Sequence, residues 1–287
     1  MTLSVIIVNY NVKQLLKECL QSVVIATEGV DSEIWVVDNH SSDGSVEMLQ
    51  TEFPTVKLIA NKENPGFSVA NNQAIRQAKG EHVLLLNPDT LVKADCFHQC
   101  LNFMESHPKC GALGVQMHDV EGTFLPESKR GLPTPWVSFS KMSGLNKLFP
   151  SLPRFNRYHL SFLDKDQNHL IDVLAGAFMW MRKSALDKAG LLDETFFMYG
   201  EDIDLSYRIQ QSGWENWYLG EVSILHYKGE STNKYSYTYI QRFYGAMKTF
   251  AKKHFTKSYP FYAISIQLLI ILHSIKLLVA HSLLGKR

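Results

Sequence analysis

Short apolar runs alternate with helical patterns through the first hundred residues of the chain. Four runs of aliphatic residues have the length of buried strands, and amphipathic stretches separate them. The predicted strands are 4–8, 33–37, 56–60 and 82–86, and the predicted helices are 12–25, 45–51, a stretch ending at 78 and another ending near 106. Strands that alternate with helices through short loops predict βαβ units. The fold class is therefore α/β, with a mostly parallel, Rossmann-like sheet covered by helices on both faces.

The periodic pattern weakens after residue 125. From Pro126 to Pro153 the chain holds five of its ten prolines, and periodicity stays poor up to Asn168. We interpret 126–168 as an irregular lid or acceptor-binding segment, because loops of this length usually serve a function. Apolar strand patterns return at 171–180 and 222–225.

The C-terminal segment 260–284 is almost wholly apolar, and Lys276 is its only charge when histidine is neutral. Gln267, Ser274 and His281 recur every seven residues and give the predicted helix a narrow polar stripe. This pattern is typical of an amphipathic helix lying on a membrane surface. Packing against a second copy in a homodimer, or a true membrane span, are the alternatives.

The net charge of +1 over 287 residues argues against a strongly basic nucleic-acid binder. This balance conceals two oppositely charged parts. Residues 1–225 carry 19 Lys and Arg against 27 Asp and Glu, whereas 226–287 carry 10 against 1. The asymmetry predicts an acidic, ligand-binding domain over 1–229 and a basic helical tail over 230–287 that meets an anionic membrane surface.

The four cysteines contain no C-x-x-C pair. Cys96, His98 and Cys100 have a spacing that a metal ion can use, but no second pair completes a zinc site, so buried reduced thiols are the favoured interpretation. The N-terminus shows no signal-peptide pattern and enters a predicted strand almost at once. We therefore expect a cytoplasmic protein associated peripherally with the inner face of the cell membrane.

Polar side chains occur where successive predicted strands end. Asn9, Asp38, Asn64 and Asp89 all lie at or just beyond a carboxyl end. In open α/β sheets ligands bind along that edge. Each residue alone has an ordinary alternative as a helix cap or turn former, but together they predict a binding site.

Several nucleotide-binding and catalytic motifs are missing. The chain has no G-x-G-x-x-G after its first strand, no G-x-x-x-x-G-K-[ST] and no G-x-S-x-G. Their absence argues against a dinucleotide-dependent dehydrogenase, a P-loop NTPase and a serine hydrolase. A diphosphate ligand without a glycine-rich loop needs a metal ion, and the turn Asn87-Pro88-Asp89 offers a carboxylate to Mg²⁺ or Mn²⁺. Alone, this tripeptide is also a common turn.

The densest group of acids follows a glycine. Gly200 precedes Glu201 and Asp202, which open a predicted helix behind four aromatic or methionine residues. Acids favour a helix N-terminus through its dipole, but an acid flanked by apolar groups also has a raised pKa, which suits a general base. His226 ends a predicted strand and is either structural or a metal ligand.

Seven motifs, in order, resemble those of glycosyltransferase family 2. They are SVIIVNYN, VVDNHSSDGS, NPGFSVANN, LLLNPDT, LAGAFMWMR, DETFFMYGEDIDLSYR and ILHYKG. The chain looks more narrowly like the bacterial rhamnosyltransferase-type branch, in which N-P-D stands where other members carry D-x-D. The resemblance covers 4–229, about three quarters of the chain.

The resemblance implies a GT-A fold and an inverting transfer of sugar from a nucleotide diphosphate. It implies Asp202 as catalytic base and Asp89 with His226 as ligands of Mg²⁺ or Mn²⁺, and Asp38 as a partner of the pyrimidine ring. The implied donor-binding residues are Val8, Asn9, Tyr10, Asp38, Asn64, Gly66, Asn71, Asn87, Gly176, Ala177 and Glu201. Asn87 is a poorer metal ligand than the aspartate of D-x-D, so the choice between the two ions stays open.

The expected reaction transfers L-rhamnose from dTDP-L-rhamnose to a polyprenyl-linked acceptor or a growing surface glycan. A UDP-hexose donor is the first alternative. A catalytically idle scaffold that binds glycan or nucleotide is the second, although intact Asp89 and Asp202 argue against it.

Overall fold

The computed structural model describes residues 1–150, 152–227 and 237–255, apart from the side chains of Met142 and of residues 237–240. The predicted C-terminal helix over 260–284 and Gly229 lie outside the described residues. A nine-stranded sheet forms the centre, with the order β3-β2-β1-β4-β8-β6-β9-β5 and β7 paired to β9. The strands are β1 (Leu3–Asn9), β2 (Ser32–Asp38), β3 (Lys57–Ala60), β4 (His82–Leu86), β5 (Thr90–Val92), β6 (Cys110–His118), β7 (His169–Leu170), β8 (Phe178–Arg182) and β9 (Glu215–His226).

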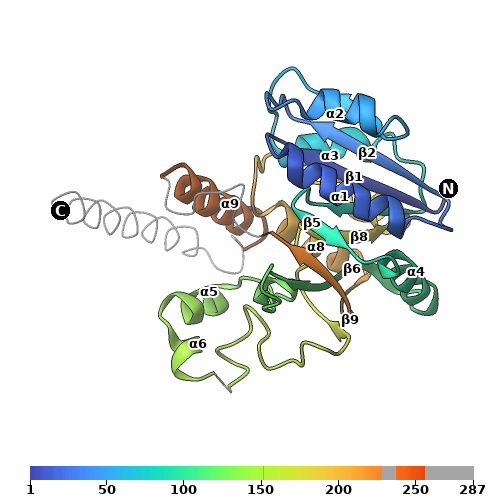
Figure 1. Cartoon of the computed structure of the whole chain (residues 1–287). Helices are drawn as coiled ribbons and strands as arrows, with labels where there is room; N and C mark the ends of the chain where they lie inside the picture. The colour runs from blue at the N-terminus through green and yellow to red at the C-terminus, as the bar shows by residue number, and fades with distance from the viewer. Residues whose placement is uncertain (151, 228–236, 256–287) are drawn as a thin grey trace.

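Helices cover both faces of this sheet (Figure 1). They are α1 (Lys13–Ala26), α2 (Ser45–Glu52), α3 (Phe67–Ile75), α4 (Cys96–Ser106), α5 (Pro135–Met142), α6 (Leu145–Leu148), α7 (Lys183–Ala189), α8 (Glu201–Gln211) and α9 (Tyr237–Phe255), with a 3₁₀ turn at Pro126–Ser128. One core cluster joins the sheet to α1, α2 and α4, and a second joins it to α3, α7 and α8. The three-layer α/β prediction is therefore confirmed.

The parallel part of the sheet is the part that the sequence pattern predicted. Strands β1 to β4 pair in parallel, and the aliphatic runs of β1, β2 and β4 are buried, whereas the edge strand β3 is only partly buried. Strand β8 then pairs antiparallel with β4, and β6 antiparallel with β8, so the second half of the sheet mixes directions. The sequence pattern missed β5, because three residues are too few to show alternation. This strand exists through antiparallel pairing with the distant β9.

The segment 126–168 is less irregular than expected. Helix α5 begins after Thr134, whose side chain accepts a hydrogen bond from the Val137 amide, and Pro135 occupies the first helical turn. A Thr cap followed by Pro is a signal for the start of a helix. The sequence analysis did not detect it, because other prolines occur throughout the segment. The rest of the segment, as far as the structure describes it, consists of the 3₁₀ turn Pro126–Ser128, the short helix α6 and loops.

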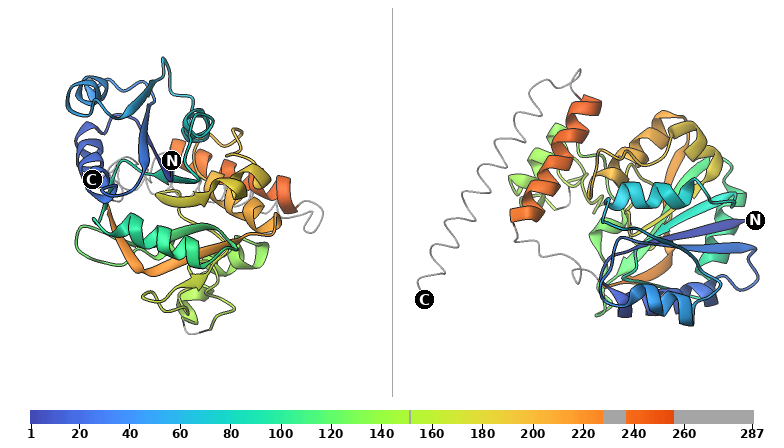
Figure 2. Two further views of the ribbon diagram at one scale, coloured as in Figure 1. Left: turned by 90° about the vertical axis from the view of Figure 1, so that its right-hand side faces the viewer. Right: turned by 90° about the horizontal axis from the view of Figure 1, so that it is seen from above.

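Helix α9 packs against α8 and so joins the α/β domain. Phe250, Ala251 and Phe255 of α9 form a small core with Phe196, and Tyr207 of α8 packs against it. Helices α5, α6 and α9 all lie on the side of the sheet away from the N-terminus, where the parallel strands end (Figures 1 and 2). The sheet edge that binds ligands in α/β folds therefore faces these three helices.

All four cysteines are buried and free, as the sequence analysis favoured. Among the described residues no helix is long and apolar enough to cross a membrane.

Candidate functional site

Residues at the ends of β1 and β2 form one buried network. Asn9 and Asp38 are register partners, and the Asn9 Nδ2 donates to Asp38 Oδ2 at 2.8 Å. The other Asp38 oxygen accepts the Ser41 amide at 2.8 Å, and the carboxylate is almost fully buried. Val8 is buried just before Asn9, whereas Tyr10 is half exposed. Asp38 therefore holds the loop after β2 together, in addition to any part it plays toward a ligand.

A second network surrounds Gly66, where the sequence placed nucleoside-binding residues. The Gly66 amide donates to Asn64 Oδ1 at 3.0 Å, and Asn39 Nδ2 donates to the same oxygen at 3.3 Å. Gly66 has φ +95°, and a Cβ there would lie 2.7 Å from the Phe197 carbonyl oxygen. Only glycine fits this close approach, which brings the loop before α8 against the start of α3.

The buried side chains of Asn71 and Asn39 both make hydrogen bonds near the start of α3, but only Asn71 was among the predicted donor-binding residues. The buried Asn71 Nδ2 donates to the Phe67 carbonyl one turn earlier in α3. This contact is internal to the helix, so Asn71 supports α3 itself. Asn39 was not anticipated, yet it joins the loop after β2 to the Asn64 and Gly66 turn.

Asp89 and His226 lie side by side, as the resemblance implied. Strand β5 pairs Thr90 with His226, and the Tyr227 amide donates to the Asp89 carbonyl at 2.8 Å. As a result His226 Nε2 is 3.3 Å from Asp89 Oδ1. Asp89 Oδ1 and His226 Nδ1 are buried and neither makes a hydrogen bond. Buried polar atoms without a hydrogen bond are rare in folded proteins. Asp89 Oδ1 and His226 Nε2 face one another, and a cation bound at this pair would take the carboxylate oxygen and the ring nitrogen as ligands.

The turn at Asn87 connects Asp89 and His226 to the segment just before β8. The Asn87 amide donates to the Ala177 carbonyl at 3.0 Å. The adjacent Gly176 amide donates to Asp202 Oδ2 at 3.2 Å. The segment Gly176-Ala177 therefore links the candidate metal ligand Asp89 to the candidate base Asp202 through main-chain contacts.

Asp202 lies in the first turn of α8 and faces an arginine that the sequence analysis did not assign to the site. The Arg130 guanidinium donates to Asp202 Oδ2 and to the Leu174 carbonyl, both at 2.5 Å. Both side chains of the ion pair are largely buried, at 12% and 14% exposed, and the Arg130 Nε has no hydrogen-bond partner. Arg130 is 72 residues from Asp202 in sequence, and only its position in a basic pair within 126–168 hinted at a role.

Glu201 is the residue of the acidic pair whose pKa is raised. Burial, with a further contribution from the negative charge of Asp202, raises the pKa of Glu201 to about 8. Its Oε2 is buried without a hydrogen-bond partner. The protein therefore favours the protonated form of the Glu201 carboxyl group.

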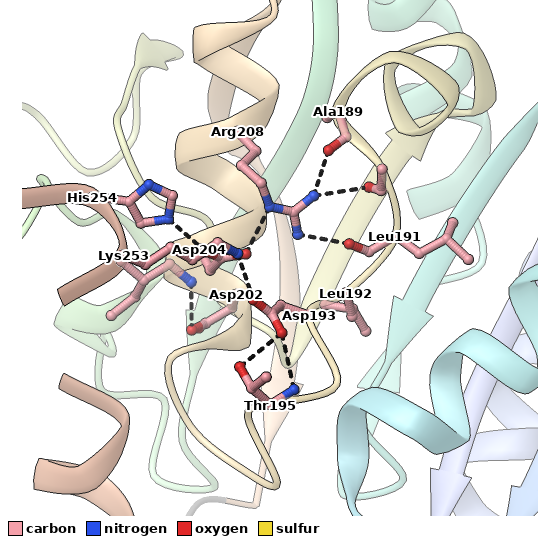
Figure 3. Close-up of polar contacts among 12 residues, drawn as sticks. Ala189, Leu191, Leu192, Asp193, Thr195, Asp202, Asp204, Arg208, Lys253 and His254 are labelled. Atoms are coloured by element: carbon pink, nitrogen blue, oxygen red, sulfur yellow. Dashed lines mark hydrogen bonds and ion pairs between the residues drawn. The ribbon is translucent and has the colours of Figure 1, made fainter. Parts of the chain in front are cut away.

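Charged side chains of α9 contact Asp204 of α8 (Figure 3). Asp204, whose side chain is fully buried, accepts from Arg208 Nε at 2.7 Å and contacts Lys253 at 2.8 Å and His254 at 2.7 Å. Lys253 also pairs with Asp193 at 2.5 Å. These contacts fix the helix whose first turn carries Asp202.

The engagement of Lys253 changes one expectation about the tail. The charge count assigned the basic cluster near 252–257 to lipid phosphates. Lys253 instead pairs with the carboxylates of Asp193 and Asp204 in the α/β domain. The sequence could not show this, because the acids lie some fifty residues earlier in the chain.

Comparison with known proteins supports the architecture and the family. The model of glycosyl transferase family 2 matches residues 4–190. N-acetylglucosaminyl-diphospho-decaprenol L-rhamnosyltransferase of Mycobacterium tuberculosis is 30% identical over 243 residues, covering 81% of this chain and 78% of that protein.

Two solved structures share the fold. S. aureus TarS 1–349 in complex with UDP-GlcNAc superposes with a TM-score of 0.60 at 20% identity, covering 88% of this chain and 66% of that one. The mannosyltransferase PcManGT of Pyrobaculum calidifontis, in complex with GDP-Man and Mn²⁺, has a TM-score of 0.58 at 17% identity and covers 98% of this chain and 74% of that one. The GT-A architecture is thus confirmed, and the sequence matches show that the chain belongs to glycosyltransferase family 2.

Proposed function

We propose that this protein is an inverting, metal-dependent rhamnosyltransferase that moves L-rhamnose from dTDP-L-rhamnose to a hydroxyl of a lipid-linked or growing surface glycan. The mycobacterial relative, by its name, transfers L-rhamnose to a sugar carried on a decaprenyl diphosphate. The observation that carries the proposal is the link between Asp202 and the Asp89 turn through Gly176-Ala177. Asp202, as the base, and the Asp89 turn, as the group that holds the diphosphate through a cation, contact the two sides of one short segment. This arrangement suits a displacement at a sugar carbon bound between Asp202 and the Asp89 turn.

In the proposed reaction Asp202 takes the proton of the acceptor hydroxyl as its oxygen attacks the anomeric carbon. The bond from that carbon to the diphosphate oxygen breaks, and the nucleotide diphosphate leaves with the electron pair. A single displacement inverts the configuration at the anomeric carbon. A general base of this kind contributes about 10²–10⁴-fold to the rate.

Arg130 has a defined part in this scheme. In the structure it occupies one oxygen of the proposed base, and its own Nε is unpartnered. The incoming diphosphate is a stronger partner for a guanidinium than a shared carboxylate oxygen. We therefore propose that Arg130 orients Asp202 before the donor binds and then turns toward the donor.

Asp89 and His226 fit a divalent cation. The donor set is one carboxylate and one imidazole, both with buried unpartnered atoms, and the described residues contain no cluster of three or more His, Cys, Asp or Glu side chains. Mg²⁺ and Mn²⁺ accept such sparse protein ligation, because waters and substrate phosphates complete the shell. When bound, the ion neutralises charge that develops on the leaving diphosphate.

The metal assignment predicts how Asp89→Ala behaves in binding. With Mn²⁺ or Mg²⁺ present, the affinity for the nucleotide sugar should fall by at least about tenfold, because the cation that joins protein and diphosphate loses a ligand. In EDTA the variant and the wild type should bind alike, as titration calorimetry can measure. Equal weakening in both conditions would contradict the metal role.

The donor is tested by thermal shift. A ligand that binds only the folded state raises the melting temperature, by an amount that grows with its concentration relative to its Kd. We expect dTDP-L-rhamnose with Mg²⁺ or Mn²⁺ to raise the midpoint more than UDP-glucose or UDP-N-acetylglucosamine. A larger shift with a UDP-hexose would change the donor, and no shift with any nucleotide sugar would favour an idle scaffold.

We further propose that the protein acts at the inner face of the cell membrane, where a lipid-linked acceptor is presented. The predicted helix over 260–284 and the alternative homodimer through it remain predictions of the sequence. No nucleic-acid partner is proposed.

A further inference from the structure

Exposed apolar side chains concentrate on one part of the structure, the α5–α6 surface. Of thirteen exposed large hydrophobic residues in the described chain, six fall within residues 136–162. They define the α5–α6 surface and are Trp136, Phe139, Leu148, Phe149, Leu152 and Phe162, which are 39–70% exposed. Soluble proteins scatter such residues singly, and a local concentration of them marks an interaction surface.

The charge of the same stretch is strongly one-sided. Residues 128–163 contain six Lys and Arg and no Asp or Glu. The other residues up to 225 contain 13 Lys and Arg against 27 acids. Lys129 and Arg130 point inward, where the Lys129 ammonium donates to two main-chain carbonyls and Arg130 pairs with Asp202. The four remaining cations, Lys141, Lys147, Arg154 and Arg157, are exposed.

Aromatic and basic side chains are interleaved on this surface. The Arg154 guanidinium lies 4.9 Å from the centre of the Trp136 ring, and the Trp136 Nε1 donates to the Arg154 carbonyl at 3.1 Å. Arg157 and Phe162 line a shallow hollow beside them. Tryptophan with arginine and lysine is the combination that membrane–water interfaces favour, because the rings enter the headgroup region while the cations meet phosphates.

The position of the surface matches this partner. Helices α5 and α6 project on the same side of the sheet as α9, beyond the carboxyl ends of the parallel strands (Figures 1 and 2). The segment that carries them also supplies Arg130 to Asp202. A bilayer against the α5–α6 surface would thus lie next to the site, where an acceptor held in the membrane has to arrive.

We propose that the α5–α6 surface docks on an anionic bilayer, independently of the predicted C-terminal helix. The docking itself is a property of the surface, and only its use for presenting an acceptor rests on the proposed function. An anionic bilayer is the chosen partner because a segment without acids, with four exposed cations and exposed aromatic rings, complements lipid phosphates above an apolar interior.

Charge reversal tests the electrostatic half of the proposal. Arg154→Glu/Arg157→Glu in the full chain should weaken partition into phosphatidylcholine vesicles containing phosphatidylglycerol by at least about tenfold at low salt. The matched control, Lys109→Glu/Lys188→Glu, makes the same change in net charge at exposed positions away from the α5–α6 surface, and should retain most of the wild-type affinity. The difference between the two double variants should shrink at high salt, because screening shortens the range of the attraction. Equal partition of both would overturn the proposal.

Removal of exposed apolar groups tests the hydrophobic half of the docking proposal. Phe139→Ser/Leu148→Ser should weaken vesicle partition several-fold, whereas Val24→Ser/Ile25→Ser, which alters comparably exposed residues on α1, should not. Vesicle flotation without donor or acceptor measures the membrane affinity of both double variants. The result does not depend on sugar transfer, so it stays valid even if the proposed reaction is wrong. If both α5–α6 variants keep their vesicle affinity but raise the KM for a lipid-linked acceptor, the surface binds that acceptor and bilayer docking is wrong.

Discussion

Asp202→Asn should reduce sugar transfer by at least about 10²–10⁴-fold while leaving the affinity for the nucleotide sugar almost unchanged. The substitution keeps the size of the side chain and replaces a basic carboxylate with an amide, which is too weak a base to take the hydroxyl proton. Arg130 loses an ionic partner, but it retains the Leu174 carbonyl, so the local structure has a remaining anchor. Turnover with a lipid-linked acceptor and calorimetric binding of the donor are the two measurements.

Comparison with Asp89→Ala separates the two roles. Asp202→Asn is expected to lose turnover with binding intact, whereas Asp89→Ala is expected to lose metal-dependent binding as well. An unchanged melting temperature for Asp202→Asn would show that the folded state survives. Simultaneous loss of binding and turnover in a folded Asp202→Asn variant would make Asp202 a binding residue, and the base would have to be sought elsewhere.

Asp204→Asn should destabilise the protein by about 3–5 kcal/mol, which is the usual penalty when one partner of a buried ion pair is removed. The Asp204 carboxylate is fully buried, and it faces Arg208 and His254, which are 18% and 11% exposed. Lys253 is a third exposed, so solvent screens its share and the lower end of this range is expected. The matched control is Asp187→Asn on α7, an exposed carboxylate that should cost less than about 0.5 kcal/mol.

The same substitution should alter the dependence of stability on pH. Burial alone would raise the pKa of Asp204, but hydrogen bonds from His254 and Lys253 and the charge of Arg208 outweigh it and lower the pKa to about 2. Since the folded pKa lies below that of the unfolded chain, about 3.9, the carboxylate contributes full stability above the unfolded value. This contribution is lost as pH falls toward 2. Guanidinium unfolding should therefore show a difference between wild type and Asp204→Asn that narrows between about pH 4 and 2. A constant difference would contradict the assignment.

Destabilisation of this cluster should also affect the proposed base, because α8 carries both Asp204 and Asp202. Lys253 and His254 of α9 hold Asp204, and Asp204 lies two residues after the proposed base. The segment that the charge count assigns wholly to the membrane therefore has a first part, α9, that packs on the helix carrying the proposed base. For residues 256–287, which lie outside the described residues, the membrane-associated tail stays a prediction.

Local sequence patterns determined the framework of this protein. Continuous aliphatic runs predicted β1, β2 and β4, because strands buried on both faces consist mainly of apolar residues. They also placed Asn9, Asp38 and Asp89 at strand ends, and the parallel order of the strands brings such ends to one edge. The family was visible in the ordered motifs, since these combine strand ends with the residues that follow them.

Only the tertiary structure decided which distant groups meet. Arg130 contacts Asp202 across 72 residues of chain, and His226 reaches Asp89 because β5 pairs with β9. Lys253 pairs with the carboxylates of Asp193 and Asp204 because α9 packs on α8. The periodicity of apolar residues along a chain indicates whether each element is buried or exposed. The partners of a charged side chain depend instead on sheet order and helix packing, which bring together residues that no local pattern connects.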